Sequence, residues 1–133
     1  MTDSRRKGRA GEQELARLLR DELELEVRRN WQAQAAQGGQ DLVGLAGYAI
    51  ECKRYAVASY ADLERWWQQA VKQARTHETP VLAYRVDRAP WRFIIPGDHR
   101  RTFALAHEVS LCGFLALVRR RRQPRAPVAE QRA

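Results

Sequence analysis

Three charged side chains interrupt an otherwise apolar stretch of the chain: Asp41, Glu51 and Lys53. Two carboxylates and an ammonium gathered on one side of a small sheet are costly unless they bind a partner. A divalent cation held by the carboxylates, with a phosphate beside the lysine, would satisfy all three charges. The types and spacing of these residues therefore predict a site for metal-assisted phosphodiester chemistry.

Two short strands are expected to position these side chains, at residues 41–45 and 48–53, with a turn between them. Side chains in a strand alternate between its two faces. Cys52 should therefore pack into the core, while Glu51 and Lys53 project together from the opposite face. This spacing aims a carboxylate and an ammonium at one point.

Mg²⁺ suits these residues because it prefers oxygen ligands and retains several waters. Asp41 and Glu51 would supply carboxylate oxygens, and the backbone carbonyl of Cys52 would supply a third ligand. Lys53 would hold or help deprotonate the attacking water and offset charge in the transition state. Mn²⁺ is expected to substitute for Mg²⁺.

A first helix is expected over residues 3–23, and Glu12 lies within its apolar stripe. The stripe consists of Leu15, Ala16, Leu18, Leu19 and Leu23. A carboxylate on a buried face needs a partner. Glu12 would bind a second metal ion or orient the ligands of the first; the alternative is an ordinary structural ion pair.

The other elements are expected from apolar periodicity and from turn residues. They are a strand at 24–29, a loop at 30–40, a helix from a capping box at Ser59 to about Thr76, and a hairpin of strands 81–86 and 91–95. Then follow a helical turn within 100–107, a short strand at 109–111, and a helix at 112–122 that buries Phe114, Leu115, Leu117 and Val118. Residues 123–133 are expected to be a disordered basic tail, which leaves one domain at 1–122.

The helix that begins near Ser59 carries two glutamines one turn apart, Gln69 and Gln73. Gln69 is a candidate contact to the metal ligands or to a phosphate, and Gln73 is a candidate DNA contact. Trp66 and Trp67 suggest base stacking, but at helical spacing they fit a core position better.

The net charge of +8 in 133 residues indicates an anionic partner, most often a nucleic acid. The plain alternative is an arginine-rich protein with no such partner. Candidate backbone contacts are Arg5, Arg6, Lys7, Arg9, Arg54 and the run Arg119–Arg122. Because arginine dominates the basic residues, a lysine at position 53 suggests a need for a compact ammonium.

Composition excludes several other classes of protein. Cys52 and Cys112 are far apart in apolar runs and are expected to be reduced core thiols of a cytosolic protein. The sequence shows no zinc-ligand spacing, no apolar run long enough to cross a bilayer and no secretory signal.

These residues resemble the PD-(D/E)xK nuclease superfamily: Glu12 on a helix, Gln40-Asp41 on a strand, and Glu51-Cys52-Lys53 on the next strand. The compact size and the Arg-Lys-Gly-Arg-Ala-Gly-Glu start resemble Holliday junction resolvases of the archaeal type and their phage or prophage relatives. Gln40 stands where many members of the superfamily have proline. The residue at this position is not a metal ligand.

The resemblance implies a single α/β domain with a central mixed sheet flanked by helices, the restriction-endonuclease-like αβββαβ core. It implies that Asp41 and Glu51 bind metal, that Lys53 is the catalytic lysine and that Glu12 is the acidic residue of the helix. The expected function is Mg²⁺-dependent cleavage of branched DNA, such as a four-way junction, by a homodimer in a bacterial, phage or prophage cytoplasm. The alternatives are a flap or nicking nuclease of this fold and a non-catalytic nucleic-acid-binding module.

Overall fold

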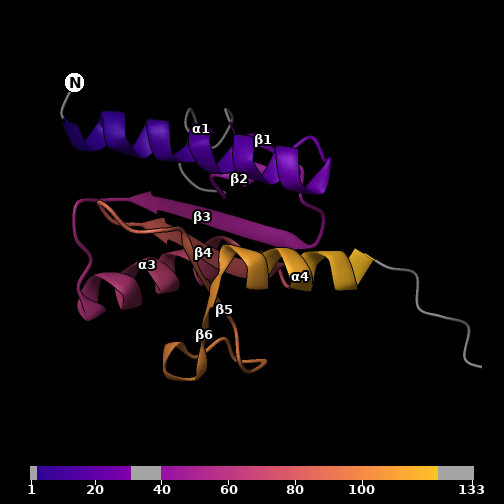
Figure 1. Ribbon diagram of the computed structural model, residues 1–133. Coiled ribbons are helices and arrows are strands. Elements are labelled where there is room, and N and C mark those ends of the chain that lie inside the picture. Colours follow the sequence, from indigo (N-terminus) through magenta and orange to yellow (C-terminus); the bar gives the residue numbers. More distant parts are fainter. Residues whose placement is uncertain (1–2, 31–39, 123–133) are drawn as a thin grey trace, which may run out of the picture.

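Six strands in one mixed sheet and three α-helices make up the part of the computed structural model that is described, residues 3–30 and 40–122 (Figure 1). In chain order the elements are α1 (Asp3–Leu23), β1 (Arg28–Arg29), β2 (Leu42–Val43), β3 (Tyr48–Arg54), α3 (Tyr60–Gln73), β4 (Thr79–Arg85), β5 (Arg92–Ile95), the 3₁₀ turn η1 (Phe103–Leu105), β6 (His107–Ser110) and α4 (Leu111–Arg122). The side chains of residues 3–5, most of the expected loop 30–40 and the expected tail 123–133 lie outside this description.

The strands lie in the sheet in the same order as in the chain, from β1 to β6. Every neighbouring pair is antiparallel except β3 and β4, which are parallel and are connected through α3. The predicted single α/β domain with an αβββαβ core and a mixed sheet is confirmed. The predicted hairpin of β4 and β5 is confirmed as well.

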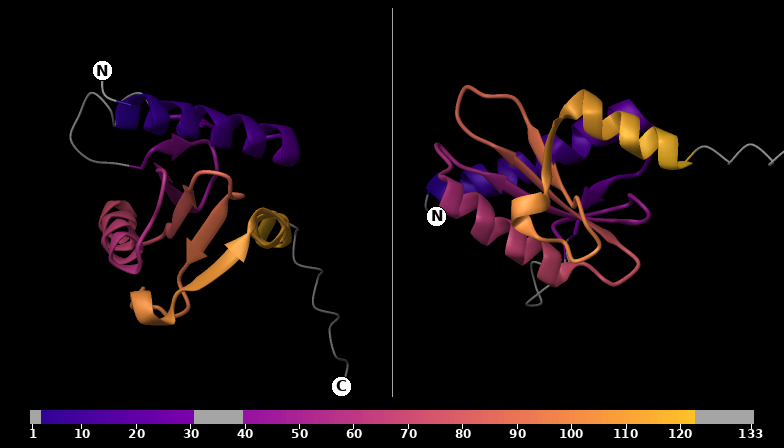
Figure 2. Two further views of the ribbon diagram at one scale, coloured as in Figure 1. Left: turned by 60° about the vertical axis from the view of Figure 1, so that its left-hand side comes forward. Right: turned by 90° about the horizontal axis from the view of Figure 1, so that it is seen from below.

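Two apolar clusters fill the space on the two faces of the sheet. One joins α1 and α4 to the face that carries Ile50 and Cys52, and the other joins α3 to the face that carries Leu82 and Tyr84. Figure 2 shows α3 and α4 on opposite sides of the sheet. Because Glu51 pairs with Leu82 in the β3–β4 register, it projects toward the α3 face.

Helix α1 has the predicted bounds and buries its stripe, with Leu15 and Leu19 fully covered. It ends where Glu24 adopts a left-handed conformation, with φ of 53°, and donates its N–H to the carbonyl of Arg20. This turn interrupts the strand predicted at 24–29, so only the last two of those residues pair in β1.

Strand β2 is also shorter than the predicted 41–45. Gly44 has φ of +103°, and a Cβ atom there would lie 2.2 Å from the carbonyl oxygen of Glu26. The chain bends at this glycine and passes close to the segment between α1 and β1. Only Leu42 and Val43 therefore form ladder pairs.

Helix α3 begins with the predicted capping box. Ser59 Oγ accepts from the N–H of Asp62 at 3.1 Å, and Asp62 Oδ2 accepts from the N–H of Ser59 at 3.0 Å. The helix ends at Gln73 and not near Thr76, because Ala74 is extended with ψ of 136°. Trp66 and Trp67 are buried, as the core interpretation predicted.

Two expectations for the C-terminal helix are wrong. Leu117 is 40% exposed, whereas Phe114, Leu115 and Val118 are buried, because the stripe that faces the sheet is narrower than the apolar run. Cys112 is exposed in the first turn of α4, so it is not a core thiol. Cys52 is buried, and neither thiol forms a disulfide.

No helix among the described residues combines the length and the apolar character needed to cross a membrane.

Candidate active site

Strand β3 presents Glu51 and Lys53 from the same face. Glu51 is 2% exposed, and the side chain of Lys53 is 16% exposed. The two groups are in contact, since Lys53 Nζ lies 3.2 Å from Glu51 Oε1. The alternation expected from the sequence therefore brings the carboxylate and the ammonium together.

Asp41 reaches the same place from the residue before β2. Its N–H donates to the carbonyl of Ile50 at 2.9 Å, and its Oδ2 accepts from the N–H of Cys52 at 2.9 Å. These two bonds hold the Asp41 carboxylate along the edge of β3, and a hydrogen bond also links it to the Glu51 carboxyl group.

The backbone carbonyl of Cys52 is directed to this side of the strand. In an extended strand the N–H and C=O of one residue point toward the same neighbour. Because the N–H of Cys52 points at Asp41, its carbonyl oxygen also faces the Asp41 side. The thiol lies on the opposite face, in the apolar cluster with α1.

Burial perturbs the ionisation of both carboxyl groups. It raises the pKa of Asp41 to about 6, although the hydrogen bond from the Cys52 N–H opposes the rise. Burial also raises the pKa of Glu51 to about 8; the nearby charge of Asp41 adds to this effect, and Lys53 opposes it. Two buried carboxyl groups that repel each other are the environment that a cation stabilises.

The donor set fits Mg²⁺ better than a metal held entirely by side chains. Within residues 3–30 and 40–122, no group of three or more His, Cys, Asp and Glu side chains is arranged to hold a metal ion. Mg²⁺ is usually bound by one or two carboxylates, with waters and substrate phosphates completing its shell. Asp41, Glu51 and the Cys52 carbonyl meet that requirement.

Glu12 takes part in an ion pair beside this site. Its Oε2 accepts from Arg29 Nε at 2.9 Å, and the two side chains are 14% and 6% exposed. The negative charge of Glu12 nevertheless contributes to raising the pKa of Asp41. The structural ion pair expected as the alternative is therefore present, and a role of Glu12 toward a metal stays a prediction.

The close approach of α1 to β3 depends on Gly11. A Cβ atom at this position would lie 2.6 Å from the Cβ of Arg54. The glycine therefore lets the helix pack directly against the end of the strand, which places Glu12 near the carboxylates.

The two predicted glutamines lie on the helix that covers the Glu51 face. Gln69 is exposed and Gln73 is half-buried. Their roles toward phosphate or DNA stay predictions.

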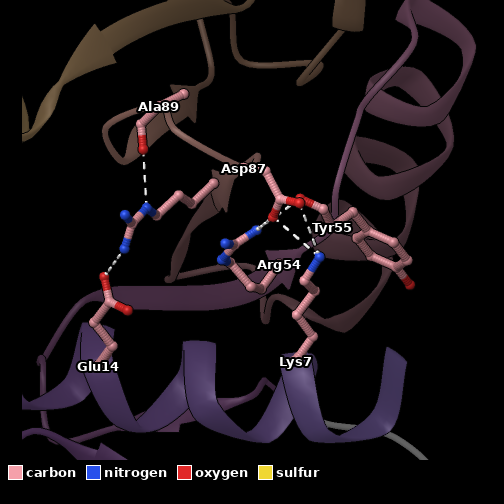
Figure 3. A network of polar contacts seen from close by, with 7 residues as sticks. Lys7, Glu14, Arg54, Tyr55, Asp87 and Ala89 are labelled. Atoms are coloured by element: carbon pink, nitrogen blue, oxygen red, sulfur yellow. Dashed lines mark hydrogen bonds and ion pairs between the residues drawn. The ribbon is translucent and has the colours of Figure 1, made fainter. Parts of the chain in front are cut away.

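Lys7 and Arg54 converge on an acidic residue that sequence reasoning missed, Asp87 in the turn between β4 and β5 (Figure 3). Lys7 Nζ lies 3.0 Å and Arg54 Nη1 2.8 Å from Asp87 Oδ1. Hydrogen bonds from these two cations hold the pKa of Asp87 below its usual range. Nothing in the local sequence indicates a pairing across this separation along the chain.

A second set of polar contacts joins α1 to the same hairpin (Figure 3). Glu14 pairs with Arg85 and accepts from Trp91 Nε1 at 2.9 Å. Arg85 Nε in turn donates to the carbonyl of Ala89 at 2.9 Å. Helix α1 is thus tied to the hairpin at two places, Lys7 and Glu14.

The other predicted basic contacts divide into two groups. Arg6 and Arg9 are exposed on α1, and the side chain of Arg5 lies outside the described part of the structure. In the run Arg119–Arg122 three residues contact the chain itself: Arg119 binds the carbonyl of Glu22, Arg121 binds Thr79 Oγ1, and Arg122 binds the carbonyl of Leu23. Much of this run therefore joins α4 to the C-terminal end of α1.

The chain matches a known family and resembles a solved structure. Residues 3–113 match the model of a family described as phage putative PDDEXK endonuclease. Among solved structures the chain is similar to Hjc, a Holliday junction resolvase from Archaeoglobus fulgidus, with 20% identity and a TM-score of 0.48 over 79% of this chain and 89% of that one. No curated protein shows a significant match. The chain therefore belongs to the phage putative PDDEXK endonuclease family, which makes it a nuclease with the restriction-endonuclease-like fold.

Proposed function

We propose that this protein is a divalent-metal-dependent endonuclease that hydrolyses phosphodiester bonds in branched DNA. The observation that carries the proposal is the convergence of Asp41, Glu51 and Lys53 at one buried point beside β3. Two carboxylates with raised pKa values and an adjacent ammonium form a group that a divalent cation and a phosphate would satisfy together.

Asp41, Glu51 and the Cys52 carbonyl would hold the ion, with Mg²⁺ expected and Mn²⁺ able to replace it. When bound, the ion polarises the phosphoryl oxygen and lowers the pKa of a water. The hydrogen bond from the Cys52 N–H fixes the orientation of Asp41 before any ligand arrives. The pre-set orientation reduces the reorganisation needed for catalysis.

Lys53 supplies the positive charge that phosphoryl chemistry needs. Its contact with Glu51 keeps the ammonium at the site. There Lys53 can hold the attacking water and offset the negative charge that develops on the phosphate oxygens. Glu12 is proposed to act on Asp41 through its charge or to bind a second ion, and Gln69 to contact phosphate.

Branched DNA and a homodimer are proposed as the substrate and the assembly. Resolving a four-way junction requires two symmetric cuts, which a two-fold dimer provides. The net charge of +8 supports a polyanionic partner. A bacterial, phage or prophage cytoplasm is the proposed setting.

Cleavage of synthetic DNA in the presence of Mg²⁺ tests the proposal. A four-way junction, a flap and a linear duplex are compared, with wild type, Asp41→Asn and Lys53→Ala. Both variants should lose cleavage and keep DNA binding. Glu64→Gln and Lys72→Ala, at exposed positions of α3, are matched controls that should cut as the wild type does.

Each outcome of this experiment tests one of the alternative functions. Unimpaired cleavage by both site variants would contradict the assignment of the site. Cutting of the linear duplex as fast as the junction would remove the branched-DNA proposal and leave a general nuclease. Binding by the wild type without cleavage in Mg²⁺ or Mn²⁺ would indicate a non-catalytic module.

A further inference from the structure

Tyr55 continues the row of side chains that begins with Glu51 and Lys53. Its N–H donates to the carbonyl of Arg85 at 3.1 Å, which extends the parallel ladder one residue beyond β3. Alternation along the strand therefore places Tyr55 on the face that carries the two site residues. Neighbours on one face of a strand are about 6.6 Å apart, so the ring begins roughly two base steps of stacked DNA from Lys53.

The ring of Tyr55 has one covered face and an open side. It stacks on Trp66, with ring centroids 4.9 Å apart and planes inclined by 20°. Trp66 is 5% exposed, whereas Tyr55 is 40% exposed. The tryptophan therefore covers one face of the ring, while part of Tyr55 stays open to solvent.

The position of this ring is held from several sides. Arg54 Nη1 donates to the carbonyl of Tyr55 at 2.7 Å, and the same guanidinium binds Asp87 (Figure 3). This contact and the ladder bond hold the backbone of Tyr55, and the stack on Trp66 holds the ring before a ligand binds. A fixed aromatic surface loses little conformational entropy on binding.

Two cations lie near Tyr55, and both contact the carboxylate of Asp87. Lys7 and Arg54 both lie beside Tyr55 (Figure 3), and the side chain of Lys7 is 35% exposed. An aromatic face among cations is the usual arrangement for binding unpaired nucleotides, because bases stack on the ring while cations hold the phosphates.

We propose that Tyr55 stacks on an unpaired nucleobase within about two nucleotides of the phosphate that is cut. This inference rests on the proposed function and adds a specificity-determining residue to it. A base at a branch point leaves its stack more easily than a base within a continuous duplex. Tyr55 would therefore favour substrates in which a base next to the cleavage site can leave the helix.

Tyr60 provides a comparison within the same protein. It is 69% exposed and makes an edge contact with Phe103, at 5.2 Å between centroids and 65° between planes. Tyr60 is the first residue of α3 and does not belong to the row of Glu51, Lys53 and Tyr55 along β3. A tyrosine that only covers apolar surface would behave in the same way at both positions.

The experiment measures cleavage of branched DNA in Mg²⁺ with an abasic nucleotide placed in turn at each of the three positions on either side of the cut. The proteins are wild type, Tyr55→Phe, Tyr55→Leu and Tyr60→Leu. For each protein the rate on normal DNA is divided by the rate on abasic DNA. This ratio is internal to each protein, so a variant with less folded protein still gives a valid value. Leucine keeps an apolar cover on Trp66 but cannot stack on a base.

At one or two positions near the cut, wild type, Tyr55→Phe and Tyr60→Leu should prefer the normal base by about 5- to 100-fold, the range expected for one stacked base. Tyr55→Leu should bring this ratio close to one. The inference would be overturned if Tyr55→Leu kept the wild-type ratio, or if the abasic nucleotide did not change the cleavage rate of the wild type. In both cases cleavage of the normal DNA would still uphold the proposed function. A wild type that binds these substrates but cuts none of them would refute the proposed function. In that case the fluorescence of 2-aminopurine placed at the same positions still tests stacking. Equal quenching of this fluorescence by wild type and Tyr55→Leu would overturn the inference.

Discussion

Asp41 lies beside Glu51, and the 2.9 Å hydrogen bond from the Cys52 N–H to Asp41 Oδ2 helps to hold it there. The bond crosses from the residue before β2 to the centre of β3. It helps to keep one carboxylate beside the other although both are largely buried. The repulsion between these two groups has measurable consequences for stability, metal binding and pH.

The metal-free protein should become less stable as the pH rises. Folding raises the pKa of Asp41 to about 6 and of Glu51 to about 8, so the folded state favours their protonated forms. The stability from this preference is complete below the unfolded pKa values near 4 and is lost as pH rises through 6 and then 8. Since one pKa unit corresponds to about 1.4 kcal/mol, we expect a loss on the order of several kcal/mol.

Urea unfolding in a chelator between pH 5 and pH 9 measures this loss. Glu51→Gln should flatten the dependence, and Glu64→Gln, at an exposed position of α3, should leave it unchanged. Equal slopes for wild type and Glu51→Gln would show that the pair does not govern stability in this range.

Mg²⁺ should stabilise the folded protein without any substrate. A ligand that binds only the folded state adds about 2.7 kcal/mol at one hundred times its dissociation constant. Asp41→Asn should reduce this gain, because the amide can still accept the Cys52 hydrogen bond but carries no charge to hold the ion. Thermal melting with and without Mg²⁺ measures the effect, and an identical shift in wild type and variant would place the ion elsewhere.

Removing the charge of Asp87 should strengthen DNA binding. Asp87 occupies Lys7 and Arg54, two cations on the surface beside the site. Asp87→Asn leaves both available for phosphates, and each phosphate contact adds about 0.9 to the slope of log affinity against log salt. Titration of DNA at several salt concentrations should show a slope steeper by about 1–2 in this variant.

In the Asp87→Asn background, adding Lys7→Ala should lower the slope again by about 1, because it removes one of the two cations that the first substitution makes available. Lys72→Ala on α3 has the same charge change at a position away from this group and serves as the control. A weaker affinity of Asp87→Asn for DNA would mean that Asp87 positions the two cations and does not compete with phosphate.

Glu12→Gln should lower both stability and activity. The pair of Glu12 with Arg29 is largely buried, and removing one partner of such a pair costs about 3 kcal/mol. Loss of the carboxylate should also lower the cleavage rate per folded molecule, because the negative charge of Glu12 acts on Asp41 and would help to attract the metal ion. Urea unfolding and single-turnover cleavage at low temperature separate the two effects. An unchanged rate per folded molecule would leave Glu12 with a structural role alone.

Local pattern predicted the elements that hold the site. The period of two along β3 was sufficient to place Glu51 and Lys53 on one face with Cys52 on the other, because side-chain direction in a strand is a property of the backbone. The capping box of α3 was predictable for the same reason, since its partners are three residues apart.

Contacts between distant elements were not predictable in this way. The pairing of Lys7 with Asp87 and of Glu12 with Arg29 depends on how α1 lies across the sheet, which no local periodicity specifies. The exposure of Leu117 and Cys112 likewise depends on how α4 is rotated against β5. Amphipathic patterns define an apolar stripe, but its width and its partners depend on packing.

The sequence alone determined which residue types meet along β3, and the proposed chemistry follows from those residue types. The tertiary structure alone decided what surrounds them: Arg29 beside Glu12, Asp87 between two cations, and Trp66 beneath Tyr55. The physical reason is the separation along the chain over which each interaction acts. Backbone geometry repeats over two to four residues, whereas charge pairing and ring stacking depend on segments that only the folded chain brings together.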